Sequence, residues 1–174
     1  LTFYGHGGDT AFSMKDDTTP TAYGEAWDVL GTSTGGTAKL GRVVGTSSGN
    51  NMFGYTNSSL MDGLTLNASL QPSEGGSGSV ESSISWGIEY TGVEGLTVGY
   101  ATDDNGATGT SAIDYNVMYA KYAYGPVTVG VTQSEQDANG STNDDEFEAI
   151  GITYQVNDDL TIGYNQSEYD NAGT

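Results

Sequence analysis

The sequence is poor in several residue types, and each shortage excludes a class of protein. It has no cysteine, which excludes disulfide frameworks, thiol catalysis and cysteine-based zinc sites. Only 4 lysine and arginine residues stand against 23 aspartate and glutamate residues, for a formal net charge of -19. A surface of that sign repels phosphate backbones, so we predict no nucleic-acid partner. No apolar run exceeds four residues, which excludes a transmembrane helix.

Glycine, tyrosine and alternating apolar residues are what the chain has in plenty. Its 27 glycines are about twice the average usage, and its 12 tyrosines argue against a disordered chain. Apolar and polar residues alternate with period two over residues 64–70, 84–90, 96–100, 127–132, 150–156 and 160–165. In the second run, for example, Ile84, Trp86 and Ile88 alternate with Ser85 and Gly87. Such alternation predicts β-strands with one apolar and one polar face.

Short turns separate these strands at a nearly constant interval. They comprise residues 61–63, 93–95, 124–126 and 157–159, and their centres are 32, 31 and 33 residues apart. Longer loops connect the other strand ends. The repeating unit is therefore strand, long loop, strand, short turn. All short turns are expected on one edge of a sheet and all long loops on the other.

Three all-β architectures show this alternation, and turn length discriminates between them. A water-soluble sandwich covers its apolar face with a second sheet and does not sort its turns by length. A β-solenoid needs parallel coils rather than hairpins. Transmembrane barrels combine short turns on one side, longer loops on the other, and strands of about 10 residues with apolar-out, polar-in alternation. We therefore predict an all-β fold, an antiparallel transmembrane β-barrel of hairpin repeats.

Tyrosines close to the short turns fit a membrane interface. Tyr90, Tyr122, Tyr124 and Tyr154 occupy the positions at which an aromatic girdle would meet the inner interface. The preference of tyrosine for strands in general is the alternative explanation.

Strand 113–123 is harder to orient than the others. If Ile113, Tyr115, Val117 and Tyr119 face lipid, Lys121 follows them outward. Its ammonium group would then extend to the interface, or a β-bulge would switch the register before it.

Five stretches of the sequence carry a family resemblance. They are LTFYGHGGDTAF (1–12), NNMFGYTNSSLMDGLTLNASLQ (50–71), GVEGLTVGYA (92–101), YAYGPVTVGV (122–131) and YQVNDDLTIGY (154–164). The first is similar to the strand that leads into the constriction loop of Gram-negative general porins of the sixteen-stranded type. The other four resemble hairpins of that family, most of all those of marine alphaproteobacterial porins.

The resemblance implies a water-filled channel in the outer membrane of a Gram-negative bacterium, for passive diffusion of small hydrophilic solutes and ions. It also implies a homotrimer in contact with outer-membrane lipid and lipopolysaccharide. On this mapping, residues 1–8 form one strand, 9–48 a constriction loop and 49–168 eight further strands. About nine of sixteen strands would then be present, so we expect the chain to be part of a longer protein.

Residues 9–48 form one long excursion before the repeat begins, and a loop of this length is usually functional. The resemblance implies that this loop folds into the pore and narrows it. Its charged residues would then line the constriction: Asp9, Asp16, Asp17, Glu25, Asp28, Lys39 and Arg42. Because acidic rings favour cations, we predict modest cation selectivity. A solvated external loop is the alternative interpretation.

No constellation of residues points to catalysis, and we predict that the chain is not an enzyme. The only histidine, His6, lies among glycines, a context typical of a strand end rather than a catalytic elbow. Residues 137–148 place oxygen ligands at the spacing of a calcium loop: Asp137, Asn139, Ser141, Asn143, Asp145 and Glu148. The sixth position is Thr142 rather than glycine and no helices are expected beside it, so only weak, superficial Ca²⁺ binding is predicted and no other cofactor.

Two other functional classes remain open at this point. A secreted or surface-exposed adhesin or structural β-protein would need loops with exposed aromatic residues, whereas these loops are mainly glycine, serine, asparagine and aspartate. A secreted carbohydrate-acting enzyme would need a sheltered pair of carboxylates, which the scattered acidic residues do not indicate.

Overall fold

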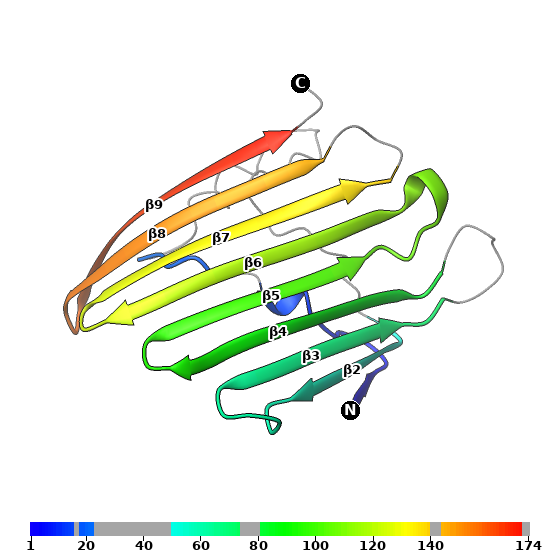
Figure 1. Cartoon of the computed structure of the whole chain (residues 1–174), viewed down its shortest axis with the longest axis horizontal. Coiled ribbons are helices and arrows are strands. Elements are labelled where there is room, and N and C mark those ends of the chain that lie inside the picture. The colour runs from blue at the N-terminus through cyan, green and yellow to red at the C-terminus, as the bar shows by residue number, and fades with distance from the viewer. Residues whose placement is uncertain (16–17, 23–49, 74–80, 140–143, 172–174) are drawn as a thin grey trace.

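Within the described residues, the chain forms a single antiparallel sheet of nine strands (Figure 1). The computed structural model describes residues 1–15, 18–22, 50–73, 81–139 and 144–171. The strands are β1 (Thr2–Tyr4), β2 (Met52–Asn57), β3 (Leu64–Gln71), β4 (Ser83–Val93), β5 (Leu96–Asp104), β6 (Ile113–Tyr124), β7 (Val127–Ala138), β8 (Asp145–Asn157) and β9 (Leu160–Asn171). Each pairs with its neighbours in sequence, so the order across the sheet is β1 to β9. This confirms the predicted all-β fold of antiparallel hairpins.

Short and long connections lie at opposite edges of the sheet (Figure 1). Residues 94–95, 125–126 and 158–159 make two-residue turns, whereas 105–112 form a longer loop that includes the 3₁₀ turn η2 (Gly109–Ser111). The β2–β3 connection, 58–63, is longer than the three-residue turn predicted there, because β2 already ends at Asn57. Within the described ranges, none of the helical segments has the length and apolar character needed to cross a membrane.

The short turns also bind neighbouring hairpins to one another. The carbonyl oxygen of Gly95 accepts a hydrogen bond from the N–H of Ala123, and that of Pro126 accepts one from Gln155, both at 2.8 Å. Gly95 has a φ of 76°, and a Cβ atom there would lie 2.2 Å from the carbonyl oxygen of Ala123. Both the backbone conformation and the close approach therefore require glycine at this turn.

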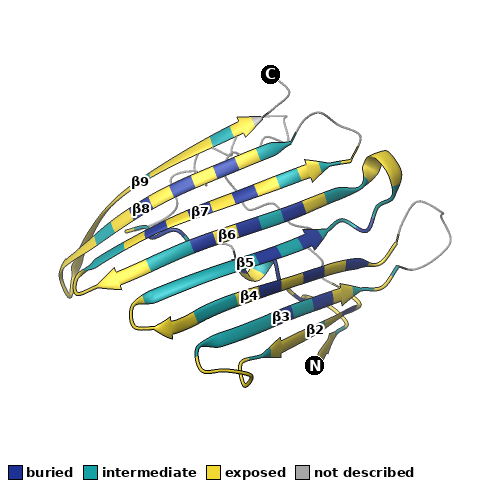
Figure 2. Ribbon diagram, viewed as in Figure 1, coloured by how far each residue is buried: buried dark blue, intermediate teal, exposed yellow. Residues whose placement is uncertain are grey.

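The exposed face of the sheet is apolar and the covered face is polar, which is the reverse of the arrangement in a water-soluble protein. We call outer face the one that carries Trp86, Ile150 and Ile162, whose exposed fractions are 47%, 54% and 55%. The inner face carries small and polar residues such as Ser85 and Thr132, which are 1% and 4% exposed. Figure 2 shows this contrast as alternating bands along the strands. An apolar face of this extent left open to solvent marks a surface for lipid or for another protein.

The orientation of strand β6, which the sequence left open, is decided by the structure. Tyr115, Val117 and Tyr119 are 7%, 1% and 6% exposed and lie on the inner face, so they do not face lipid. The register decides this, because Val117 pairs with the buried Ala101 of β5 in an unbroken ladder. Lys121 consequently lies on the inner face as well.

Rows of carboxylates cross the outer face beyond its apolar band. The apolar positions of β8, residues 150–156, cover about 23 Å along the strand at roughly 3.3 Å per residue. Toward the long-loop edge, Glu146 lies directly opposite both Glu135 and Asp170, and Glu148 lies opposite Glu168. Like charges in directly opposed positions repel one another and destabilise the pairing of the strands.

We expect Glu146→Gln to raise the thermal stability of the folded protein, since it removes repulsion toward two neighbours at once. Relief of each cross-strand pair is worth about 0.2–1 kcal/mol, and the gain should shrink as salt screens the charges. Thermal unfolding at low and high NaCl measures it. Glu94→Gln, in a short turn at the other edge, is the matched control. Equal gains for both variants, or a gain insensitive to salt, would contradict the repulsion.

Candidate functional site

A segment outside the sheet crosses its inner face from β3 to β9. We call this segment the strap; it consists of residues 9–15 and 18–22, drawn in blue behind the strands in Figure 1. Successive residues of the strap contact successive strands of the sheet. Ala11 contacts Ser69 of β3, Thr19 contacts Thr132 of β7, and Ala22 contacts Gly163 of β9. The strap therefore runs across the strands rather than along them.

The first part of the strap is fixed by hydroxyl groups of the wall. The backbone N–H of Ala11 donates to Ser69 Oγ at 3.3 Å, and that of Phe12 donates to Ser85 Oγ at 2.9 Å. A segment that crosses strands cannot use their backbone ladder, so its buried donors need side-chain partners. Thr10 then starts the 3₁₀ turn η1 (Ser13–Lys15) by accepting from the N–H of Ser13 at 3.0 Å.

Phe12 anchors the strap by burial. It is 1% exposed and packs in a cluster with Ala101, Tyr115 and Val117 of the wall. Its ring lies 6.1 Å from that of Tyr115, with the two planes tilted by 56°. Full burial of a phenylalanine side chain contributes about 1.5–3 kcal/mol. The apolar inner-face residues of β6 are thus explained by the strap that they contact.

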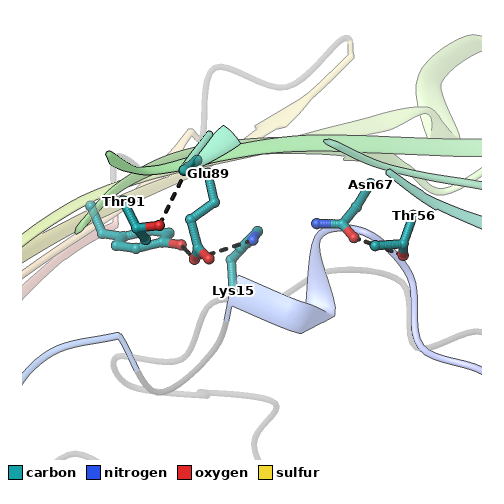
Figure 3. A network of polar contacts seen from close by, with 7 residues as sticks. Lys15, Thr56, Asn67, Glu89 and Thr91 are labelled. Carbon is teal, nitrogen blue, oxygen red and sulfur yellow. Dashed lines mark hydrogen bonds and ion pairs between the residues drawn. The ribbon is translucent and has the colours of Figure 1, made fainter. Parts of the chain in front are cut away.

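A buried charge fixes the end of η1. Lys15 is 4% exposed, and its Nζ lies 3.5 Å from Glu89 Oε2 of β4. The same carboxylate oxygen accepts a hydrogen bond from the hydroxyl of Tyr119. Figure 3 shows Lys15 rising from η1 toward Glu89, away from the separate Thr56–Asn67 hydrogen bond. If the strap moved away from the wall, the buried ammonium group of Lys15 would lose its partner, and an unpaired buried charge is costly. The pair therefore fixes the distance between this part of the strap and the wall.

The second part of the strap lies on bare backbone. Thr19 donates to Thr132 Oγ1 at 2.8 Å, and Thr18 shares the same hydroxyl at 2.8 Å. Pro20 then packs on Gly130 and Gly151, which are directly paired across β7 and β8. At Pro20 the strap therefore lies on a part of the wall that has no side chains.

The structure describes one of the seven residues predicted for the constriction. Asp9 is exposed at the start of the strap. The other six lie outside the described residues: Asp16, Asp17, Glu25, Asp28, Lys39 and Arg42. Lys15, Lys121 and Glu89 are inner-face or strap charges that the sequence reasoning did not select. The two-residue turn 125–126 could have revealed Lys121, because it pairs Lys121 with Gly130 on the polar face of β7.

Three of the six residues predicted to bind calcium weakly lie in strands, on different faces of the sheet. Asp137 lies in β7, and Asp145 and Glu148 lie in β8. Alternation along the strand puts Asp145 on the inner face and Glu148 on the outer face. Ser141 and Asn143 lie outside the described residues, and within those residues no group of three histidine, aspartate or glutamate side chains is placed to hold a metal ion.

His6 is exposed, and its Nδ1 is hydrogen bonded to Asn50.

Comparison with known proteins identifies the family. Residues 6–174 match the family model of Gram-negative porins. No curated protein and no solved structure matches the chain. The family match spans nearly the whole chain and agrees with a sheet whose apolar face is the exposed one. The chain therefore belongs to the Gram-negative porin family, which places it in the outer membrane of a Gram-negative bacterium.

Proposed function

We propose that the protein forms a water-filled channel for passive diffusion of small hydrophilic solutes and ions, narrowed by the strap. The observation that carries this proposal is the course of residues 9–15 and 18–22 across the small and polar inner face, while the opposite face is apolar and exposed. A lumen lined in this way selects by size and by electrostatic field and needs no chemical step. No reaction is therefore assigned to the protein.

The inner face supplies a lining suited to water. By register, the inner face includes Thr128 and Ser134 of β7 and Asn165 and Ser167 of β9. Hydroxyl and amide groups can replace part of the hydration of a passing solute without holding it. Such a wall supports diffusion of varied polar solutes rather than tight binding of one of them.

The outer face supplies the contact with lipid. Its apolar band would face the acyl chains, and Tyr90, Tyr122, Tyr124 and Tyr154 all share this face near the short-turn edge, as an interfacial girdle requires. The carboxylate rows at the other edge would meet the lipopolysaccharide headgroups. The resemblance of the hairpins to general porins further supports a sixteen-stranded barrel and a homotrimer as parts of this proposal.

The charges favour cations modestly. Asp9 lies exposed at the start of the strap, and the family resemblance implies further constriction carboxylates, in a chain of formal net charge -19. The charge of Lys15 is paired with that of Glu89. Among the described residues, Lys121 is the other lysine on the inner face, and it is not part of that pair. Because basic residues offset only part of the acidic field, we propose weak cation selectivity.

We expect Val129→Arg to impair assembly much more than Thr128→Arg. Val129 is 40% exposed on the outer face, whereas the adjacent Thr128 lies on the inner face. An arginine on the lipid face costs from about 0–1 kcal/mol near the interface to about 2–4 kcal/mol at the bilayer midplane, whereas a lumen already holds water. Heat-modifiable gel mobility of the folded protein measures assembly. Equal tolerance of the two variants would rule out a lipid-facing outer surface.

We expect Lys121→Gln to shift the reversal potential of the assembled channel further toward cation selectivity. The shift should be larger at low salt, where the screening length reaches about 30 Å at 0.01 M. Planar-bilayer recordings in a KCl gradient measure it. Asp159→Asn, in a short turn at the sheet edge, is the control and should have little effect. An unchanged potential in Lys121→Gln would show that its charge does not face the conducting path.

A further inference from the structure

We propose that three inner-face glycines, Gly130, Gly151 and Gly163, form a seat for the strap and thereby set the free width of the pore. This inference rests on the proposed function, because it concerns how closely the narrowing segment lies against the wall. We call the three residues the glycine seat. They belong to three consecutive strands, β7, β8 and β9.

Gly151 is the tightest point of the glycine seat. A Cβ atom at this position would lie 2.3 Å from the carbonyl oxygen of Pro20 and 2.9 Å from Thr19 Cγ2. Ordinary contact between non-bonded heavy atoms requires about 3.5–4.0 Å. The obstructing oxygen belongs to the backbone, so no side-chain rotation can relieve the clash. Any side chain at Gly151 must therefore displace the strap by about 1 Å or more.

The two neighbouring glycines extend the same contact. A Cβ atom on Gly130 would lie 2.6 Å from Pro20 Cδ, and one on Gly163 would lie 2.9 Å from Ala22 Cβ. Gly130 and Gly151 face each other directly in the ladder. Gly163 pairs with Thr153, two residues along β8 from Gly151, so the contact steps toward the short-turn edge as the strap advances.

Backbone conformation does not explain these glycines. The left-handed glycines of the described chain are Gly7, Gly63, Gly95, Gly106, Gly109 and Gly125, so the glycine seat has strand conformations that other residues adopt readily. Glycine weakens a strand, because it has no side chain to pack and loses more entropy on folding. Close approach of another segment of the chain is the remaining physical reason, and the strap is that segment.

The other contacts of the strap determine which way it moves when the seat is filled. Phe12 is buried among wall side chains and Lys15 is paired with Glu89, so the first half of the strap stays attached. A methyl group at Gly151 then pushes the second half, Thr19 to Ala22, away from the wall. Displacement in that direction narrows the passage, and a larger side chain narrows it further.

The position of the strap can be tested without measuring conduction. Because the chain has no cysteine, Thr19→Cys with Thr132→Cys introduces a single pair of thiols, at hydroxyls now 2.8 Å apart. We expect this pair to form a disulfide on mild oxidation of the folded, assembled porin, detected as loss of maleimide labelling. Adding Gly151→Val should strongly reduce disulfide formation, whereas adding Gly5→Ala, where the nearest atom is 3.9 Å away, should not.

Single-channel conductance tests the effect on pore width. We expect a graded loss of conductance from wild type through Gly151→Ala to Gly151→Val, with heat-modifiable mobility used to confirm assembly of each variant. Gly5→Ala should conduct like wild type. If Gly151→Val does not assemble, Gly151→Ala and Gly130→Ala carry the same test with a smaller volume change.

A rescue experiment distinguishes a seat from a general effect on the strands. The atoms that oppose Gly130 belong to the ring of Pro20, Cδ at 2.6 Å and Cγ at 3.0 Å, whereas Gly151 meets the backbone oxygen of Pro20. Pro20→Ala should therefore restore both disulfide formation and conductance to Gly130→Ala, and should not restore them to Gly151→Ala. The added Cβ atom at position 130 would also lie 3.2 Å from the carbonyl oxygen of Ala120. This contact is present in Gly130→Ala both with and without Pro20→Ala, so it does not affect the comparison between them.

The outcomes separate this inference from the proposed function. Undiminished disulfide formation in Gly151→Val, or equal rescue of both glycine variants by Pro20→Ala, would overturn the glycine seat whatever the channel conducts. Reduced disulfide formation with unchanged conductance would overturn its control of pore width and show that the strap is not the narrowing element. A wild-type protein that assembles but does not conduct would refute the proposed channel, while the thiol pair still reports on the seat.

Discussion

Hydrogen bonding between the backbones of neighbouring strands is the constraint on which the rest of this structure depends. A strand in hydrocarbon has no water to satisfy its N–H and C=O groups, so the adjacent strands must supply every partner. The ladder between β6 and β7 accordingly runs without a break from Ile113 opposite Ala138 to Tyr124 opposite Val127. An unbroken ladder fixes the register, and the register assigns every side chain to one face. The same pairing therefore decides which residues meet lipid and which form the wall beneath the strap.

This dependence explains how much of the fold could be predicted from the sequence. Alternation and the regular spacing of turns predicted the hairpins that follow residue 50, because both are local signals, whereas β1 was expected from the family resemblance. They left β6 undecided, because apolar residues occupy both of its faces: Met118 lies on the outer face and Val117 packs with Phe12. Pattern alone cannot tell an apolar residue that faces lipid from one that faces a strap. Only the hairpin register, which runs from the turn at 125–126 to Lys121 opposite Gly130, settles the orientation.

The candidate site was less accessible to sequence reasoning, because its contacts join residues far apart in the chain. The long excursion after residue 8 indicated a functional segment, but nothing local pairs Lys15 with Glu89 or Phe12 with Tyr115. Selection of charged residues alone also missed the uncharged wall. Glycines that alternate with apolar residues in β7, β8 and β9 were visible in the pattern, yet a glycine in a strand is informative only when the backbone that approaches it is known.

The two halves of the strap are held by different means, and the difference decides how many residues control the position of each half. At Phe12 the wall supplies side chains, so position there depends on complementary packing and changes only if several residues change together. At Pro20 the wall supplies bare backbone, so the approach is limited by Gly130 and Gly151 alone. A substitution at either glycine alters the inner face but leaves the ladder and the lipid-facing residues as they are, since successive side chains point to opposite faces. The fold thus separates the residues that keep the protein in the membrane from those that set the strap's position. If the strap narrows the channel as proposed, pore width can change by single substitutions without loss of the fold.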